Sequence, residues 1–157
     1  MRKGFQIGES KVVESRESQD GTMIRRRRVS LDGKHRFTTY ERIERPSIIV
    51  KKRSGSRESF DRDKLMRAVR NSVGKYFKDD MEIEAVVSQV EDIIYGLEKE
   101  EIPSSAIGES ILDVLAGVNE VAYVRFASVF REFTSLEEFE KIIAEQKRSQ
   151  KEKKKGE

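Results

Sequence analysis

Cysteine is absent from this 157-residue sequence, and histidine occurs once, as His35. Without cysteine the chain forms no disulfide, offers no thiolate nucleophile and provides no cysteine-ligated metal site. A single imidazole also makes a His-rich metal site or a conventional Ser/His triad hard to build. These absences point away from the commonest metal and nucleophile chemistries.

Long apolar runs and tryptophan are also absent. No stretch approaches the roughly 18 apolar residues of a membrane-spanning helix, and the N-terminal segment lacks the apolar stretch of a signal peptide. Hydrophobic residues make up 36% of the chain and charged residues 39%, which leaves apolar material for modest cores. The composition predicts a soluble, cytoplasmic α+β protein without membrane association, built from one ordinary domain or two small ones.

Charge is abundant, and its sign changes along the chain. Residues 1–78 carry 22 Lys and Arg against 10 Asp and Glu, a net charge of +12, whereas residues 79–146 carry 4 against 17, a net charge of −13. The last eleven residues have a net charge of +4. This asymmetry indicates that the first half faces a polyanion, namely nucleic acid, nucleotide phosphate or both. The alternative is an unevenly charged, solvated surface.

Residues 1–46 show no helical periodicity. Short β-type runs at residues 11–13, 22–24 and 36–40 are separated by Asp-Gly pairs, which are hairpin signals. We expect a small three-stranded sheet. A segment this small and this polar seldom folds without a metal, a disulfide or a partner.

After Pro46 the pattern changes to one hairpin followed by helices. Residues 47–52 and 57–60 predict two strands around a Ser54-Gly55 turn. Helices are predicted from Asp61 to about Lys78, from Asp79, from Pro103, from about Asn119 to Phe133, and from Ser135. The helix near residues 119–133 is apolar on more than one side, so we expect it to be the most buried. The Lys-rich segment after Lys147 is expected to be disordered.

Enzyme motifs are missing. The sequence contains no P-loop, no dinucleotide-binding GxGxxG, no HExxH and no GxSxG. Its acidic pairs, at residues 79–80 and 100–101, fall at helix starts and loops, where helix capping and solvation explain them. We therefore predict no catalytic residues and a protein that is not an enzyme.

A run of four arginines is the first feature that points to a partner. Successive side chains of a strand alternate between the two faces of a sheet, so four adjacent guanidinium groups cannot all serve one protein face. Such a run fits contact with the phosphates of a duplex. The alternatives are a solvated surface or a targeting tag. The candidate DNA-binding residues are Arg25, Arg26, Arg27, Arg28, Arg36 and Arg42.

The hairpin after Pro46 is the second such feature. Lys52 and Arg53 lead into the Ser54-Gly55 turn, and Lys64 lies one turn into the next helix. Cations around a helix N-terminus suit a triphosphate, because free N–H groups also favour anions there. Glu58 opposes phosphate and suits an amino group of a base. The alternative is a plain hairpin with a charged edge.

Together these segments resemble the NrdR family of bacterial transcriptional repressors of ribonucleotide reductase genes. The resemblance covers about residues 1–143. It is carried by SRES at 15–18, by the arginine run, by RFTTYER at 36–42, by FDRDKL at 60–65, by IPS at 102–104, by Ile107-Gly108 and by residues 121–129. The family joins an N-terminal zinc-ribbon DNA-binding domain to an ATP-cone domain, a β-hairpin with a helical bundle that binds ATP or dATP. Nucleotide state sets the homo-oligomer, which in turn sets binding to double-stranded promoter DNA.

The resemblance implies a division of the chain and a set of nucleotide contacts. Residues 1–46 correspond to the ribbon-like domain, residues 47–138 to the ATP cone, and residues 139–157 to a C-terminal helix end and the Lys-rich tail. By resemblance Lys52, Arg53 and Lys64 contact phosphates and Glu58 contacts the adenine. The ring faces pack on Val50 and Leu65, and Tyr123 lies near the same pocket.

The sequence departs from the family at the zinc site. The two CxxC motifs of the family align with Lys3, Gln6, Ser30 and Gly33, which do not form a zinc-ligand set. The resemblance thus implies a nucleotide-sensing repressor whose zinc ribbon is degenerate. The alternative is an ATP-cone regulator that acts mainly through protein–protein contacts, with weak or no specific DNA binding.

Overall fold

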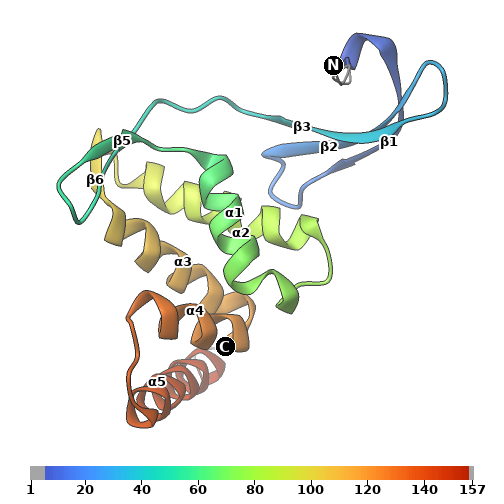
Figure 1. The fold of residues 1–157 in the computed structure, drawn as a ribbon. Coiled ribbons are helices and arrows are strands. Elements are labelled where there is room, and N and C mark those ends of the chain that lie inside the picture. Colours follow the sequence, from blue (N-terminus) through green and yellow to red (C-terminus); the bar gives the residue numbers. More distant parts are fainter. Residues whose placement is uncertain (1–5, 156–157) are drawn as a thin grey trace. The chain divides into compact units, whose positions relative to one another are not determined.

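The computed structural model describes residues 6–155, which fall into two compact units with a boundary between Pro46 and Ser47 (Figure 1). The first unit contains strands, and the second combines a small sheet with α-helices. The α+β class and the three-stranded N-terminal sheet predicted from the sequence are confirmed. Within residues 6–155, no helix has both the length and the apolar character needed to cross a membrane.

The first unit is an antiparallel sheet in the order β1-β2-β3. A short 3-10 turn, Ile7–Glu9, precedes the strands β1 (Ser10–Glu17), β2 (Met23–Ser30) and β3 (Arg36–Arg42). The register shifts between Val12 and Glu14, which indicates a β-bulge in β1. Among the described residues of this unit, Met23 is the only buried hydrophobic side chain. Apolar burial therefore contributes little to its stability, and strand hydrogen bonds and turns matter more.

Both turns of this sheet have the sequence Ser-x-Asp-Gly, at residues 18–21 and 30–33. In the second turn the Ser30 hydroxyl donates to the Asp32 carboxylate, and Gly33 N donates to Ser30 O at 2.8 Å. The N–H of His35 donates to Ser30 Oγ at 3.1 Å. The two glycines have φ of 68° and 73°, a region that side chains with a Cβ disfavour. Side-chain and backbone hydrogen bonds thus close both turns.

The second unit is built around a three-stranded sheet in the order β5-β4-β6. β4 (Ile49–Lys51) and β5 (Arg57–Ser59) form the predicted hairpin, and β6 (Glu101–Pro103) pairs with β4 in parallel. The sequence did not predict β6. Its central residue, Ile102, is 1% exposed, so this strand joins the sheet to the core.

Five helices surround this core: α1 (Arg62–Val73), α2 (Asp80–Gly96), α3 (Ser104–Val118), α4 (Glu120–Phe130) and α5 (Leu136–Lys155). Figure 1 shows the short sheet at one end of the helical bundle. The predicted caps Asp61 and Asp79 are present, since they accept from Lys64 N and Glu82 N. Asn119 also caps α4 by accepting from Ala122 N. A 3-10 turn, Gly74–Tyr76, follows α1, so this helix ends before Lys78.

Two expectations about the C-terminal half are wrong. The most buried helix is not α4, because its Val121 and Val129 are 60% and 55% exposed, while α2 and α3 hold more of the core. The segment after Lys147 is helical to Lys155 and not disordered. Polar contacts attach this part of α5: the buried Gln146, just before the segment, donates to Ala116 O at 2.7 Å, and Gln150 within it donates to Glu120. Apolar patterning did not reveal these contacts.

A buried ion cluster joins α1 to α2. Arg62 donates through Nη2 to Glu84 at 2.8 Å and through Nε to Glu91 at 2.9 Å. The exposed fractions of these side chains are 17%, 5% and 11%. A buried charge is costly without a partner, so this arginine positions the start of α1 against α2.

Candidate nucleotide pocket and nucleic-acid interface

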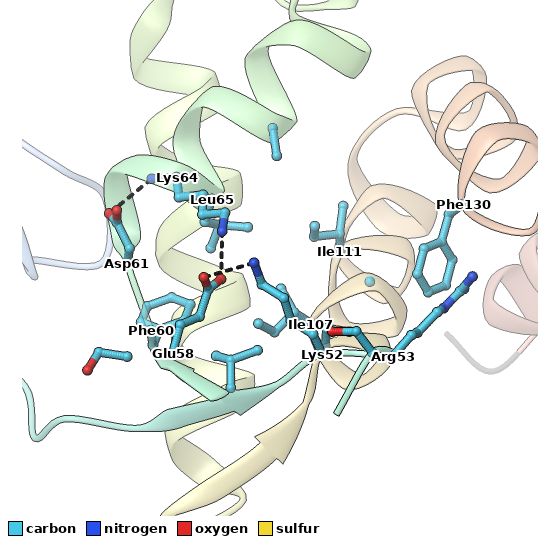
Figure 2. A pocket seen from close by; sticks show the side chains of 16 residues that line it. Lys52, Arg53, Glu58, Phe60, Asp61, Lys64, Leu65, Ile107, Ile111 and Phe130 are labelled. Atoms are coloured by element: carbon cyan, nitrogen blue, oxygen red, sulfur yellow. Dashed lines mark hydrogen bonds and ion pairs between the residues drawn. The ribbon is translucent and has the colours of Figure 1, made fainter. Parts of the chain in front are cut away.

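A pocket of about 590 Å³ lies where the β4–β5 hairpin, the start of α1, α3 and the end of α4 meet (Figure 2). This volume is in the range of small-molecule sites. Six of the seven predicted nucleotide-binding residues line it: Val50, Lys52, Arg53, Glu58, Lys64 and Leu65. Segments distant in the sequence thus place these side chains around one cavity.

The hairpin turn brings Lys52 and Arg53 to the pocket. Lys52 N donates to Ser56 O at 2.8 Å, and Gly55 N donates to Lys52 O at 2.9 Å. Gly55 has φ of 87°, which glycine adopts without steric cost. Ser56 N donates to the hydroxyl of Ser54 at 3.4 Å, so serine at this position is compatible with a closed turn.

Lys64 reaches the pocket because α1 begins beside it. The side chain of Asp61 accepts from Lys64 N at 3.1 Å and caps the helix. This cap fixes the first turn of α1, so the Lys64 side chain projects toward the hairpin (Figure 2). The N-terminal end of a helix also favours anions.

The carboxylate of Glu58 lies between the two lysines, as Figure 2 shows. Lys64 Nζ is 2.6 Å from Glu58 Oε1, and Lys52 Nζ is 2.9 Å from Glu58 Oε2. Hydrogen bonds first from Lys64 and then from Lys52 lower the pKa of Glu58. The bond to Glu58 in turn raises the pKa of Lys64. These bonds favour the charged forms of Glu58 and Lys64. Arg53 and Asp61 also line the pocket.

The opposite wall is apolar and includes residues that were not predicted. Besides Val50 and Leu65, the pocket is lined by Phe60, Ile107, Ile111 and Phe130. Phe130 lies over Gly108 so closely that a Cβ there would be 2.1 Å from its ring. A flat base fits between such side chains, while phosphates fit the lysines. Phe60 and Ile107 were part of the family resemblance, whereas Phe130 was interpreted only as core packing.

Tyr123 does not line this pocket, contrary to the expectation. It lies on α4 beside a second depression, together with Glu109, Asp113 and Arg131. Burial is the main cause that raises the pKa of Tyr123. Tyr123 and Phe130 are seven residues apart and so lie on the same side of α4, but about two turns apart along the helix. Only Phe130, at the C-terminal end of α4, lines the first pocket.

The predicted DNA-binding arginines divide between the two faces of the N-terminal sheet. In the strand register Arg25, Arg27, Arg36 and Arg42 share one face, and Arg26 and Arg28 lie on the other. The arginine run is entirely within β2. The structure thus brings four of the six candidate residues together and separates two from them.

The residues at the family's zinc positions do not fit a zinc ion. Lys3 lies outside the described residues, Gln6 precedes the first turn, and Ser30 and Gly33 belong to the Ser-x-Asp-Gly turn. Residues 6–155 contain no cluster of three or more His, Asp or Glu that suits a metal. The Ser30 hydroxyl is already bonded within the turn, and Gly33 has no side chain to ligate zinc.

Each of the two units matches a known family model. The model described as "ATP cone domain" matches residues 48–136, so the second unit is an ATP cone. The model described as "Transcriptional repressor NrdR-like, N-terminal domain" matches residues 6–41.

Full-length relatives agree with the two models. The chain is 47% identical over 130 residues to Transcriptional repressor NrdR of Trichodesmium erythraeum, covering 83% of this chain and 74% of the relative. It is 45% identical over 134 residues to the repressor of the same name from Myxococcus xanthus (85% and 80% covered). It is also 45% identical over 140 residues to that of Dictyoglomus thermophilum (87% and 91% covered). The chain belongs to the NrdR family, a family of transcriptional repressors and not of enzymes.

Proposed function

We propose that the chain is a nucleotide-sensing transcriptional repressor. ATP or dATP binds in the pocket between the hairpin, α1 and α3, and the N-terminal sheet binds promoter DNA of ribonucleotide reductase genes. The bound nucleotide determines which homo-oligomer forms, and the oligomeric state determines the affinity of the protein for DNA. The observation that carries this proposal is the convergence of Lys52, Glu58 and Lys64 beside an apolar wall.

The test measures DNA binding and size with three nucleotide states. A labelled reductase promoter and a shuffled duplex are titrated with the full chain in ATP, in dATP and without nucleotide, and the same samples are sized by light scattering. We expect promoter preference and oligomer size to change together with the nucleotide. Equal affinity for both duplexes in all three states would contradict the proposal.

A second function is favoured by the zinc-site replacements. If the N-terminal sheet does not recognise a promoter, the chain acts as an ATP-cone regulator through protein–protein contacts. This alternative predicts nucleotide binding and nucleotide-dependent size without promoter preference. The same titration distinguishes the two functions.

A further inference from the structure

The strand register of the N-terminal sheet sorts its charged side chains by face. Cross-strand partners share a face, and successive residues alternate between faces. We define the Arg25 face by its six cations, Lys11, Arg16, Arg25, Arg27, Arg36 and Arg42, with Glu14 as the one acid at its paired positions. The Arg26 face has Arg26 and Arg28 at paired positions, balanced by Glu17 and Glu41. Nearly all of the sheet's excess positive charge is thus on one side.

The two arginines of the Arg26 face are used within the sheet. Arg26 Nε donates to Glu41 at 2.5 Å, and its Nη1 donates to the Ser15 hydroxyl at 3.0 Å. Arg28 Nη1 donates to the hydroxyl of Ser10 at 3.0 Å, and its Nε bonds to Thr39. Each arginine therefore connects β2 to both neighbouring strands. In a sheet with little apolar core, such bonds hold the strands in register.

On the Arg25 face, Arg16 and Arg27 have less internal compensation. Glu14 is 2.5 Å from Arg16 and 3.8 Å from Arg27, so a single carboxylate serves both. The Arg27 side chain is 55% exposed, compared with 29% for Arg26. The buried Nε of Arg25 has no hydrogen-bond partner. This nitrogen therefore makes no bond to a neighbouring strand, unlike the guanidinium nitrogens of Arg26 and Arg28.

We propose that the Arg25 face contacts the phosphates of duplex DNA and that the Arg26 face stabilises the sheet. The identification of DNA as the partner rests on the proposed function. The choice of the Arg25 face rests on the strand register and the hydrogen bonds. The assignment adds Lys11 and Arg16 to the phosphate contacts and removes Arg26 and Arg28 from them. The spaced cations of three adjacent strands suit the repeating charge of a duplex backbone.

The experiment compares two variants with equal loss of charge from the same strand, Arg25→Gln/Arg27→Gln and Arg26→Gln/Arg28→Gln. Binding of the full chain to a fluorescent duplex of random sequence is measured over a series of salt concentrations. We expect Arg25→Gln/Arg27→Gln to weaken binding about tenfold or more and to reduce the slope of log affinity against log salt by about two. Arg26→Gln/Arg28→Gln should keep the wild-type slope and lose thermal stability.

A third variant keeps the test decisive if Arg26→Gln/Arg28→Gln unfolds the sheet. Lys11→Gln/Arg16→Gln removes two cations from the Arg25 face without changing the arginine run, and it should reduce the salt slope by about two. An unchanged slope in this variant, or an equal loss of slope from both arginine pairs, would overturn the assignment. A duplex of random sequence makes the result independent of promoter preference. A wrong assignment of the face can therefore be distinguished from a wrong assignment of the repressor function. A wild-type chain that binds no duplex would overturn both.

Discussion

At the scale of single residues, Glu58 competes with phosphate for the two lysines of the pocket. Its carboxylate contacts both Lys52 and Lys64, and these contacts lower its pKa. Because the pKa in the folded state is lowered, the ion pairs are present at neutral pH and are lost as the pH falls through that value. A triphosphate that enters the pocket must therefore replace a carboxylate as the partner of these lysines.

The first prediction concerns Glu58→Gln. We expect inorganic tripolyphosphate to bind this variant roughly two- to tenfold more tightly than the wild type, since the lysines are no longer held by an anion. The affinity for ATP should rise less, because the variant also loses the Glu58 carboxylate that is proposed to contact the adenine base. Isothermal calorimetry of both ligands measures the difference, with Glu100→Gln as a charge-matched control outside the pocket.

The pH dependence of tripolyphosphate binding provides a second test of the role of Glu58. Below the ordinary range of a glutamate the wild-type Glu58 becomes protonated, so the advantage of Glu58→Gln for tripolyphosphate should shrink. An advantage that does not depend on pH, or no advantage at neutral pH, would show that Glu58 does not restrain the lysines.

The second prediction concerns the lysines themselves. Charge-assisted hydrogen bonds contribute about 1.5–3 kcal/mol each, so Lys52→Gln or Lys64→Gln should weaken ATP binding by about tenfold or more. The double variant Lys51→Gln/Lys78→Gln removes two exposed lysines that do not line the pocket and serves as a control. Calorimetric affinities that are the same for pocket and control variants would refute the phosphate site.

At the scale of elements, the contact between α3 and α4 shapes the apolar wall of the pocket. Gly108 of α3 lies under the ring of Phe130, which stacks on Phe126 with ring centroids 5.8 Å apart. An added Cβ would lie 2.1 Å from Phe130 Cε2 and 2.3 Å from Cζ, so the ring or one of the helices must move. The absence of a side chain at this position is therefore a packing requirement.

The third prediction follows from this contact. Gly108→Ala should destabilise the protein by about 1–3 kcal/mol through overpacking and should also weaken nucleotide binding, because Phe130 lines the pocket. Gly117→Ala, in the same helix but with open space around its Cβ, should instead be neutral or stabilising by up to about 1 kcal/mol. Urea unfolding measures the stability of both variants, and the increase in stability on addition of ATP compares their nucleotide binding. Equal stability of the two variants would contradict the close packing.

Local elements were predictable from the sequence, and long-range ones were not. Asp61, Asp79 and Asn119 cap helices through contacts within three residues, which sequence patterns capture. β6 has only three residues, and it pairs with β4 across the long stretch of sequence that contains α1 and α2. Lys52, Glu58 and Lys64 were predictable because they lie on the hairpin and on the first turn of α1, which are local elements. Phe130 and Tyr123 were misjudged because they share a side of α4, and the sequence does not show which end of this helix lies beside the pocket.

At the scale of the whole molecule, the N-terminal sheet forms without the zinc ligands of its family. Hydrogen-bonded Ser-x-Asp-Gly turns close both hairpins, and Arg26 and Arg28 connect the three strands. Serine hydroxyls and aspartate carboxylates accept hydrogen bonds from backbone N–H groups in both turns, and the second turn includes Ser30 and Gly33, two of the positions that align with zinc ligands. The shape of this unit thus depends on side-chain hydrogen bonds.

The fourth prediction is that metal chelation leaves this unit folded. Amide signals of residues 10–42 in the NMR spectrum of the full chain should stay dispersed in excess EDTA and should not shift on addition of zinc. Ser30→Ala/Asp32→Ala should weaken the same region, because it removes the side-chain bonds of the second turn. Signals that collapse to random-coil positions with EDTA would contradict a metal-independent fold.

The parallel pairing of β4 with β6 joins segments that are distant in the sequence. Ile49 pairs with Glu101, so this sheet requires the long loop between them to close. The entropy of closing such a loop must be overcome before the contact stabilises the chain, which slows folding. The pocket therefore belongs to the fully folded unit, and a nucleotide that binds it shifts the equilibrium away from unfolded chains. Cellular nucleotide would in this way also set how long each copy of the protein survives proteolysis.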